Sequence, residues 1–144
     1  MPLLINISNH PSSSWSEGQK RGWDIIDVPF LVVPWDASEE DVRNLAQGIF
    51  SSLVQLLYQR EKRRGYCCRQ PEKNRIIIKR LCASATIHVA GEWSLFFALV
   101  SLLRSYGATI VCACSERKTV ETIRTDGATQ KQTIFEFKKW REIK

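Results

Sequence analysis

Short apolar runs rich in β-branched residues alternate with helical segments along this chain, and this alternation constrains the fold more than any other feature. The apolar runs lie at residues 3–7, 24–30, 85–91 and 108–114. Helical patterns lie between them, the clearest at residues 38–64 and 93–106. Strands that alternate with helices form a parallel sheet with right-handed crossovers and helices on both faces. The sequence therefore predicts an α/β fold with a mostly parallel sheet.

The segment 38–64 carries the strongest helix signal. Ser38 and Asp41 form an N-terminal capping pair, and Gly65 is a C-cap candidate. Apolar residues recur at helical spacing between them: Val42, Leu45, Ala46, Ile49, Phe50, Leu53, Leu56 and Leu57. We expect one long amphipathic helix here.

Three other segments have less regular patterns. Ser14 and Glu17 form a capping-box pair, which predicts a short helix that begins near Trp15 and ends before Gly22. Residues 66–74 are polar and predict a loop. Residues 75–81 fit either an extra edge strand or an extended connector, and the sequence leaves both open.

The second half of the chain carries one further helix signal and one hairpin signal. The helix at residues 93–106 is apolar on nearly every face, which predicts burial against a sheet or at a subunit interface. Residues 119–125 and 132–137, joined by the turn Asp126-Gly127, predict a C-terminal β-hairpin.

Length and charge narrow the class of protein. A chain of 144 residues has the usual size of one domain, so we expect a single domain over residues 1–144. Its 21 basic and 15 acidic residues give a net charge of +6, which suits a polyanionic partner. The alternative is that the basic groups are solvated ends of helices and strands. They cluster in two places: Arg60, Lys62, Arg63, Arg64 and Arg69, and then Lys138, Lys139, Arg141 and Lys144.

The cysteines and the N-terminal segment argue against several classes of protein, among them disulfide-rich, zinc-binding and secreted proteins. The five cysteines are odd in number and form no Cys-x-x-Cys pair, which argues against a disulfide framework and a zinc site. We expect Cys112 and Cys114 to share one face of a strand as small apolar side chains. Glycine-rich dinucleotide motifs, Walker motifs and paired metal-ligand spacings are absent, so we expect neither a cofactor nor a metal. No signal peptide or membrane span is evident, which predicts a cytoplasmic protein without a membrane partner.

Candidate site residues follow from where ligands bind in such sheets. Ligands bind outside the carboxyl ends of the strands, near the point where strand order reverses. Three segments follow predicted strands: 8–15, 91–93 and 115–117. We therefore expect the site to be built from these segments.

The first segment is the richest in polar groups. Ser12, Ser13 and Ser14 bring hydroxyl and N–H groups to a predicted helix start, where a phosphate binds favourably. His10 is a candidate phosphate donor or acid–base group, and Asn9 is a candidate for a sugar or base edge. The alternative is a capped turn in which His10 only bonds the backbone.

The other two segments add fewer candidates. Gly91 allows close approach of a ligand, Glu92 is either a ligand contact or a helix starter, and Trp93 either stacks on a base or packs in the core. Ser115 and Arg117 are candidates for phosphate contact. His88 lies within an apolar strand and is interpreted as a core residue.

Three motifs together carry a family resemblance: Ile5–Gln19, Ile87–Glu92 and Cys114–Val120. With them the chain resembles small CRISPR-associated proteins of type III systems built from a lone CARF-type, Rossmann-like domain, several of which are ring nucleases. The likeness spans roughly Leu3 to Val120, with residues 64–84 as an insertion or extended loop and 118–138 as the hairpin.

The resemblance implies a homodimer that binds cyclic oligoadenylate, the second messenger of type III defence, and no DNA. It implies metal-independent cleavage, in which a ribose 2′-OH attacks the adjacent phosphodiester and leaves a 2′,3′-cyclic phosphate. Carried onto this chain, His10 or Arg117 is the catalytic candidate. The ligand-binding candidates are Asn9, Ser12, Ser13, Ser14, Trp15, Gly91, Glu92, Trp93 and Ser115.

Two other functions stay open at this point. The first is a module that binds the messenger as a sensor or regulator without cutting it. The second is a general RNA-binding or ribonuclease domain that uses the basic cluster from Arg60 to Arg69.

Overall fold

A computed structural model describes residues 1–66 and 69–144 of the chain. In these residues a five-stranded sheet has the order β2-β1-β3-β4-β5. The strands are β1 Leu3–Ile7, β2 Asp24–Val28, β3 Thr86–Val89, β4 Thr109–Ile123 and β5 Thr129–Glu142. The first four strands pair in parallel, and β5 pairs antiparallel to β4. The predicted α/β fold with a mostly parallel sheet is confirmed.

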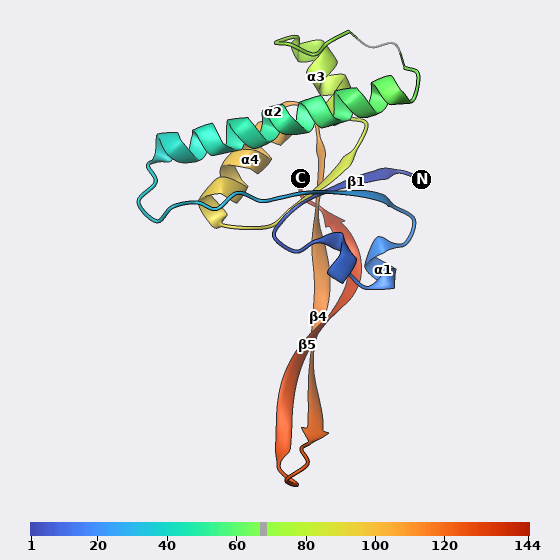
Figure 1. Ribbon diagram of the computed structural model, residues 1–144, viewed down its shortest axis with the longest axis vertical. Coiled ribbons are helices and arrows are strands. Elements are labelled where there is room, and N and C mark those ends of the chain that lie inside the picture. Colours follow the sequence, from blue (N-terminus) through green and yellow to red (C-terminus); the bar gives the residue numbers. More distant parts are fainter. Residues whose placement is uncertain (67–68) are drawn as a thin grey trace.

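The three larger helices cover one face of the sheet (Figure 1). They are α2 Glu39–Arg63, α3 Arg75–Cys82 and α4 Trp93–Ser105. Alternate strand residues point into this layer, because successive side chains of a strand point to opposite faces. Leu3, Ile5 and Ile7 of β1 and Ile87 and Val89 of β3 are at most 6% exposed there. The main core therefore lies between the sheet and these helices.

The opposite face carries a smaller layer formed by η1 Ser12–Ser14 and α1 Glu17–Lys20. Here Leu4, Trp15 and Val111 form a second buried cluster, against which Trp140 packs. Helices thus lie on both faces, as predicted, although this face has only two short ones among the described residues.

The predicted long helix is confirmed as α2. Ser38 accepts from the Asp41 N–H at 3.1 Å, and Asp41 accepts from the Ser38 N–H at 2.8 Å, so the capping box is complete. At the other end Arg64 is the C-cap, and Gly65 follows with a φ of 82°. The left-handed region at this position favours glycine.

The prediction for residues 75–81 was wrong in both alternatives, because the segment is the helix α3. Its N-cap Asn74 accepts from the N–H groups of Ile76 and Ile77. Ile78, Leu81 and Cys82 are buried at helical spacing. Three consecutive isoleucines favour a strand by propensity, but burial of one helical face outweighs that preference. Cys67 and Cys68 lie outside the described residues.

The short first helix begins later than the capping pair predicted. Its N-cap is Ser16, which accepts from the Gln19 N–H at 3.3 Å. Ser14 instead belongs to η1, and its hydroxyl donates to the Pro11 carbonyl at 2.8 Å. The pair Ser14–Glu17 is therefore not a capping box.

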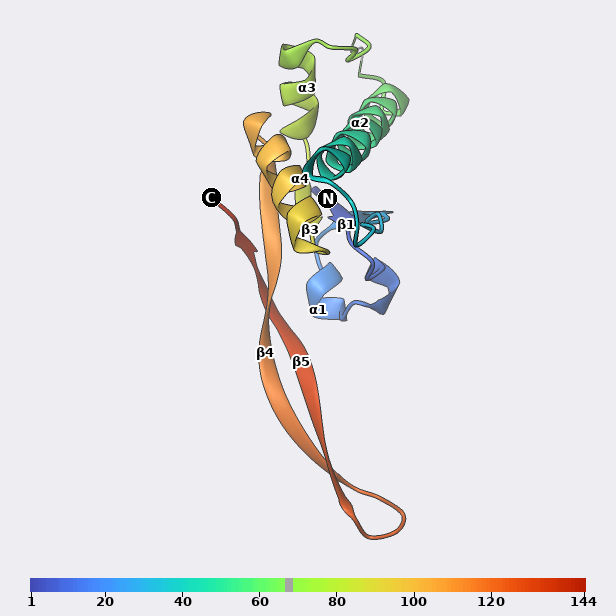
Figure 2. The same cartoon turned by 90° about the vertical axis from the view of Figure 1, so that its left-hand side faces the viewer.

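The fourth strand and the C-terminal hairpin are continuous, where the sequence predicted separate elements. β4 runs unbroken to Ile123, and β5 pairs with it along its length apart from an irregularity at Cys114/Ser115. The predicted turn is confirmed, with Gly127 at a φ of 83°. The far part of the hairpin projects from the body as a two-stranded ribbon (Figure 2). Ser115 and Arg117 therefore lie within a strand, not in a loop after one.

Candidate functional site

The order in which strands are added to the sheet reverses between β1 and β3. From β1 the chain crosses to β2 on one side, and from β2 it passes back over β1 to β3 and on to β4. β1 and β3 are hydrogen-bonded neighbours, with Ile7 opposite Val89. Their carboxyl ends therefore form the switch point of the sheet, where α/β proteins bind ligands. Of the predicted site segments, 8–15 and 91–93 begin here.

A row of three polar side chains crosses the sheet one position before this edge. In the strand register Asn6 lies opposite Asp27 of β2 on one side and opposite His88 of β3 on the other. All three belong to the face that carries Trp15. Asn6 is fully buried and His88 is 8% exposed. A buried polar group is costly unless it is hydrogen-bonded, so the partners of this row are informative.

Asn6 ties the loop after β1 to the sheet. Its side-chain amide donates to Asp27 Oδ1 at 2.8 Å and to the His10 carbonyl at 2.9 Å. Its Oδ1 accepts from the Ser8 hydroxyl at 2.8 Å, and the Ser8 Oγ accepts from the His10 N–H at 3.2 Å. These bonds fix the backbone of residues 8–10. Asn9 and His10 are themselves exposed.

Asp27 occupies the start of η1. Its carboxylate accepts from the Ser12 N–H at 3.0 and 3.2 Å and from the Ser12 hydroxyl at 2.9 Å. Desolvation raises the pKa of the Asp27 carboxyl, but the bonds from Asn6 and Ser12 outweigh it and lower the pKa below its ordinary value. The N–H group of Ser12, predicted to meet a phosphate, is thus already paired with a carboxylate, while Ser13 and Ser14 remain exposed.

His88 is a core residue, as predicted. Its ring contacts those of Trp15 and Trp140, with centroids 5.8 and 5.1 Å away. Its Nδ1 lies 3.2 Å from the Val111 carbonyl, so the neutral ring carries its proton on Nδ1. Burial lowers the pKa of His88, the Val111 carbonyl raises it, and the charge of His10 lowers it further, with a net downward shift.

Gly91 and Glu92 have structural roles at the end of β3. A Cβ on Gly91 would lie 2.3 Å from the Phe30 ring, so the side chain that approaches this glycine is Phe30. Glu92 is the N-cap of α4, and its carboxylate accepts from the Ser94 hydroxyl and from the Ser94 and Leu95 N–H groups. These bonds lower the pKa of Glu92. The helix-starter interpretation of Glu92 therefore fits its contacts.

Trp93 is 79% exposed, and Phe97 one turn later is 73% exposed. The same helix buries Leu95, Leu99 and Leu103 completely. The expected burial of α4 against the sheet is thus confirmed for one side of the helix, and burial of the other side at a subunit interface stays a prediction. Trp93 presents a free aromatic surface beside the switch point.

A cavity of about 640 Å³ lies where the ribbon meets the first loop. We call it the arm-base cavity. It brings together three predicted site residues from distant parts of the chain, Ser14, Trp15 and Ser115. The remaining lining residues were not predicted individually: Ser16 and Gln19 at α1, Lys118 and Val120 on β4, and Ile134, Phe135, Glu136 and Phe137, which the pairing of β5 with β4 brings there. Arg117 does not line this cavity and is exposed on β4.

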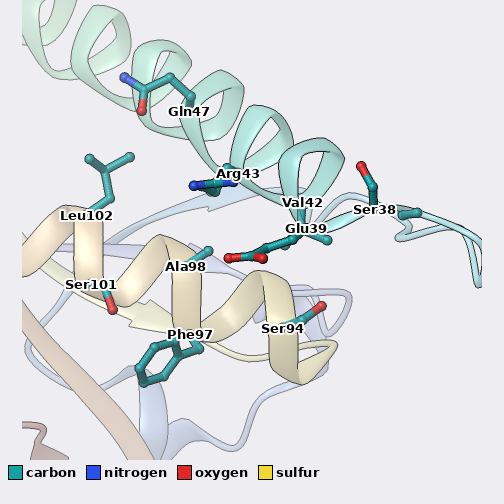
Figure 3. Close-up of a pocket in the computed structure, with 12 residues that line it drawn as sticks. Ser38, Glu39, Val42, Arg43, Gln47, Ser94, Phe97, Ala98, Ser101 and Leu102 are labelled. Carbon is teal, nitrogen blue, oxygen red and sulfur yellow. The ribbon is translucent and has the colours of Figure 1, made fainter.

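A second cavity of about 660 Å³ lies between part of α2 and part of α4, on the helical face (Figure 3). Its walls are mostly apolar, with Val42 and Ala46 on one helix and Phe97, Ala98 and Leu102 on the other. The predicted site residues do not line it.

The basic cluster at the end of α2 lies at the other edge of the sheet. Arg60 pairs with Asp24, the first residue of β2, at 2.5 Å. The amino ends of parallel strands share one edge, so this cluster is remote from the switch point. The basic cluster at the end of α2 therefore does not lie at the candidate site.

The cysteines, the potential metal ligands and the helices of residues 1–66 and 69–144 relate to the classes of protein considered from the sequence. Cys82, Cys112 and Cys114 are free thiols, of which Cys82 is fully buried. This part of the chain contains no cluster of three potential metal-ligating side chains. None of its helices is both long and apolar enough to span a membrane.

Comparison with known proteins gives one match. No curated protein and no solved structure is similar to the chain at a significant level. A family model described as the "Uncharacterized protein MJ1673 family" matches residues 2–141. The match covers nearly the whole chain, and the chain therefore belongs to the Uncharacterized protein MJ1673 family.

Proposed function

We propose that this chain binds a cyclic oligoadenylate at the carboxyl edge of β1 and β3 and cleaves it as a ring nuclease. One observation carries the proposal. A backbone fixed by Asn6 and Ser8 holds Asn9 and His10 exposed at the switch point of the sheet. The motif resemblance names the ligand, and the geometry supports a site at that position.

Binding would use the exposed groups around this edge. The Asn9 amide and the Ser13 hydroxyl are free to meet ribose and phosphate, and the Trp93 ring is free to stack on an adenine. A cyclic tetramer or hexamer has an even number of repeats, so a two-fold homodimer matches its symmetry. In such a dimer each subunit presents the same loop to one half of the ring.

Cleavage would need a base for the 2′-OH and a donor for the leaving oxygen. The 2′-oxygen attacks the adjacent phosphorus, the bond to the 5′-oxygen breaks, and the products carry a 2′,3′-cyclic phosphate and a 5′-hydroxyl. In this proposal His10 exchanges the proton and Arg117 stabilises the charge on phosphate. The remaining acceleration would come from holding the attack in line.

A messenger-binding module that does not cut is the second candidate, and a specific observation favours it. The donors at the starts of η1 and α4 are paired with Asp27 and Glu92. These N–H groups are not available to stabilise a developing charge on phosphate. Catalysis would therefore need other groups to stabilise this charge, whereas binding would not.

The test is incubation of the purified protein with cyclic tetra- and hexa-adenylate in the presence of a chelator, with products resolved by chromatography and mass spectrometry. We expect linear products that end in a 2′,3′-cyclic phosphate. His10→Ala should lower the rate at least tenfold, and Ser51→Ala, an exposed change in the middle of α2, should leave it unchanged.

Three other results of this experiment would contradict the proposal in different ways. Intact rings that nevertheless bind tightly would replace cleavage by the binding module. Rings that neither bind nor break would reject both candidates. Activity on linear RNA with steep salt dependence would favour the basic cluster from Arg60 to Arg69.

A further inference from the structure

Cys112 and Cys114 form a pair of thiols on β4. The sequence predicted them as small apolar side chains, but both are half-buried, whereas Cys82 is fully buried. Residues two apart on a strand point to the same face. Ile110 packs with the helices on that face, so the pair lies on the helical side of the sheet, opposite the face that carries η1 and α1. Half-buried thiols are within reach of a small ligand.

The two thiols interact with each other and with a nearby cation. Burial raises the pKa of the Cys112 thiol, and the charge of Cys114 and a hydrogen bond with it raise this pKa further. The charge of Arg141 and a backbone hydrogen bond lower it, with a net upward shift. Two thiolates side by side repel each other, which disfavours loss of the second proton. A cation between the two sulfur atoms would remove that repulsion and take the place of both protons.

The neighbouring strand supplies positive charge on the same face. In the register of β4 and β5, Cys112 lies opposite Arg141 and Cys114 lies opposite Lys139. Residues directly opposite each other in an antiparallel pair project from the same face of the sheet. Both basic side chains are exposed, and neither forms an ion pair within residues 1–66 and 69–144. These two charges are therefore available to offset a negatively charged complex at the cysteines.

The kind and number of ligands select the ion. Thiolates are soft ligands that suit Cu(I) and zinc, but structural zinc sites need four ligands. Within residues 1–66 and 69–144 no three potential ligands come together, so this part of the chain offers the two sulfur atoms alone. A disulfide fits less well, because residues two apart on a strand are about 6.6 Å apart, whereas its Cβ atoms must come within roughly 3.5–4.5 Å. Cu(I), which accepts two thiolates in a linear arrangement, bridges the wider gap.

We propose that Cys112 and Cys114 bind one Cu(I) ion between their sulfur atoms. Binding forms two Cu–S bonds and releases the two thiol protons, so the complex carries one negative charge and the copper keeps its oxidation state. Arg141 and Lys139 offset that charge from the opposite strand. The site goes beyond the proposed function, shares no residue with it and stands or fails separately from it.

The experiment titrates the reduced protein with Cu(I) under anaerobic conditions, in competition with the chromogenic chelator bicinchoninate. The background carries Cys67→Ser and Cys68→Ser, because these two thiols lie outside the described residues. We expect one tightly bound ion per chain, with two sulfur ligands by X-ray absorption. Cys112→Ser and Cys114→Ser should each weaken binding at least tenfold, since each removes one of two soft ligands. Arg141→Gln should weaken it several-fold.

Ala113→Ser is the matched control, because Ala113 is exposed between the two cysteines and points to the other face, and it should leave binding unchanged. Circular dichroism and thermal melting check folding. Should Cys112→Ser unfold, Cys112→Ala replaces it and must give the same loss. No bound ion, binding that both serine variants retain, or equal loss in Ala113→Ser would overturn the proposal. So would a reduced protein that binds no Cu(I) but loses two hydrogens at these cysteines on mild oxidation, in favour of a disulfide pair.

Discussion

Asn6 donates its side-chain amide to Asp27 Oδ1 at 2.8 Å across two neighbouring parallel strands. The second N–H of the same amide reaches the His10 carbonyl at 2.9 Å. A single buried side chain thus joins the sheet to the loop that carries the candidate site. The position of His10 follows from the register of β1 and β2, because a slip of one residue would move Asn6 to the other face.

The pairing of Asp27 with the start of η1 gives the first prediction. Asp27→Asn removes the charge that accepts from the Ser12 N–H and hydroxyl. We expect a loss of about 1–2 kcal/mol in the free energy of unfolding, the usual range for a cap or a charged hydrogen bond. Urea denaturation measures it. Asp36→Asn, an exposed change before α2, is the control and should be neutral; equal stability of both variants would contradict the assignment.

Contact between Gly91 and Phe30 gives the second prediction. Gly91→Ala places a methyl group 2.3 Å from the Phe30 ring, so the ring or the strand end must move. We expect a loss of about 1–3 kcal/mol, as for other overpacked sites. Gly48→Ala is the matched control, because its Cβ meets open space within α2, and it should stabilise the protein by up to about 1 kcal/mol.

A double-mutant cycle then separates packing from ligand contact at Gly91. Phe30→Leu shortens the obstructing side chain, so the cost of Gly91→Ala should be smaller in that background. The same cost in both backgrounds would show that Phe30 is not the reason for glycine at this position.

The buried His88 gives the third prediction. The pKa of His88 is lower in the folded protein than its ordinary value of 6.5, chiefly because of burial. The unfolded chain therefore binds a proton more readily, and stability should be full above pH 6.5 and fall as the pH drops below it. His88→Phe keeps an aromatic ring among Trp15 and Trp140 without titrating, and should flatten the profile in this window. Thermal melts from pH 7.5 to about 5 measure it.

His10→Ala is the control for that profile. It should retain most of the decline, since His10 is exposed and only adds its charge to the surroundings of His88. If His10→Ala flattened the profile and His88→Phe left it unchanged, the pH dependence would come from His10, and our assignment to His88 would be wrong.

Local signals predicted the elements that local chemistry determines. The capping box of Ser38 and Asp41 fixed the start of α2, and the Asp126-Gly127 pair located the hairpin turn. The row of apolar residues from Leu3 to Ile7 identified a fully buried strand. In each case the evidence lay within a few residues of the element itself.

Features that depend on distant pairing were missed. α3 was mistaken because its three isoleucines favour a strand until one helical face is buried against α2. Ser115 and Arg117 were placed in a loop because nothing nearby shows that β5 extends β4 to Ile123. The partners of Ser12 and Gly91, Asp27 and Phe30, come from β2 and the link after it. Of the three segments predicted to follow strands, 8–15 and 91–93 begin at the switch point, whereas 115–117 lies within β4.

Equilibrium binding measures whether the edge formed by the ends of β1 and β3 binds a ring-shaped oligoadenylate. Isothermal titration compares cyclic tetra- and hexa-adenylate with linear oligoadenylates of the same length, for the wild type, Asn9→Ala and the control Ser51→Ala. We expect that one ring binds at least tenfold more tightly than its linear counterpart, and that of the two variants only Asn9→Ala weakens this binding. Equal affinity for ring and linear RNA, or no binding of either ring, would contradict it.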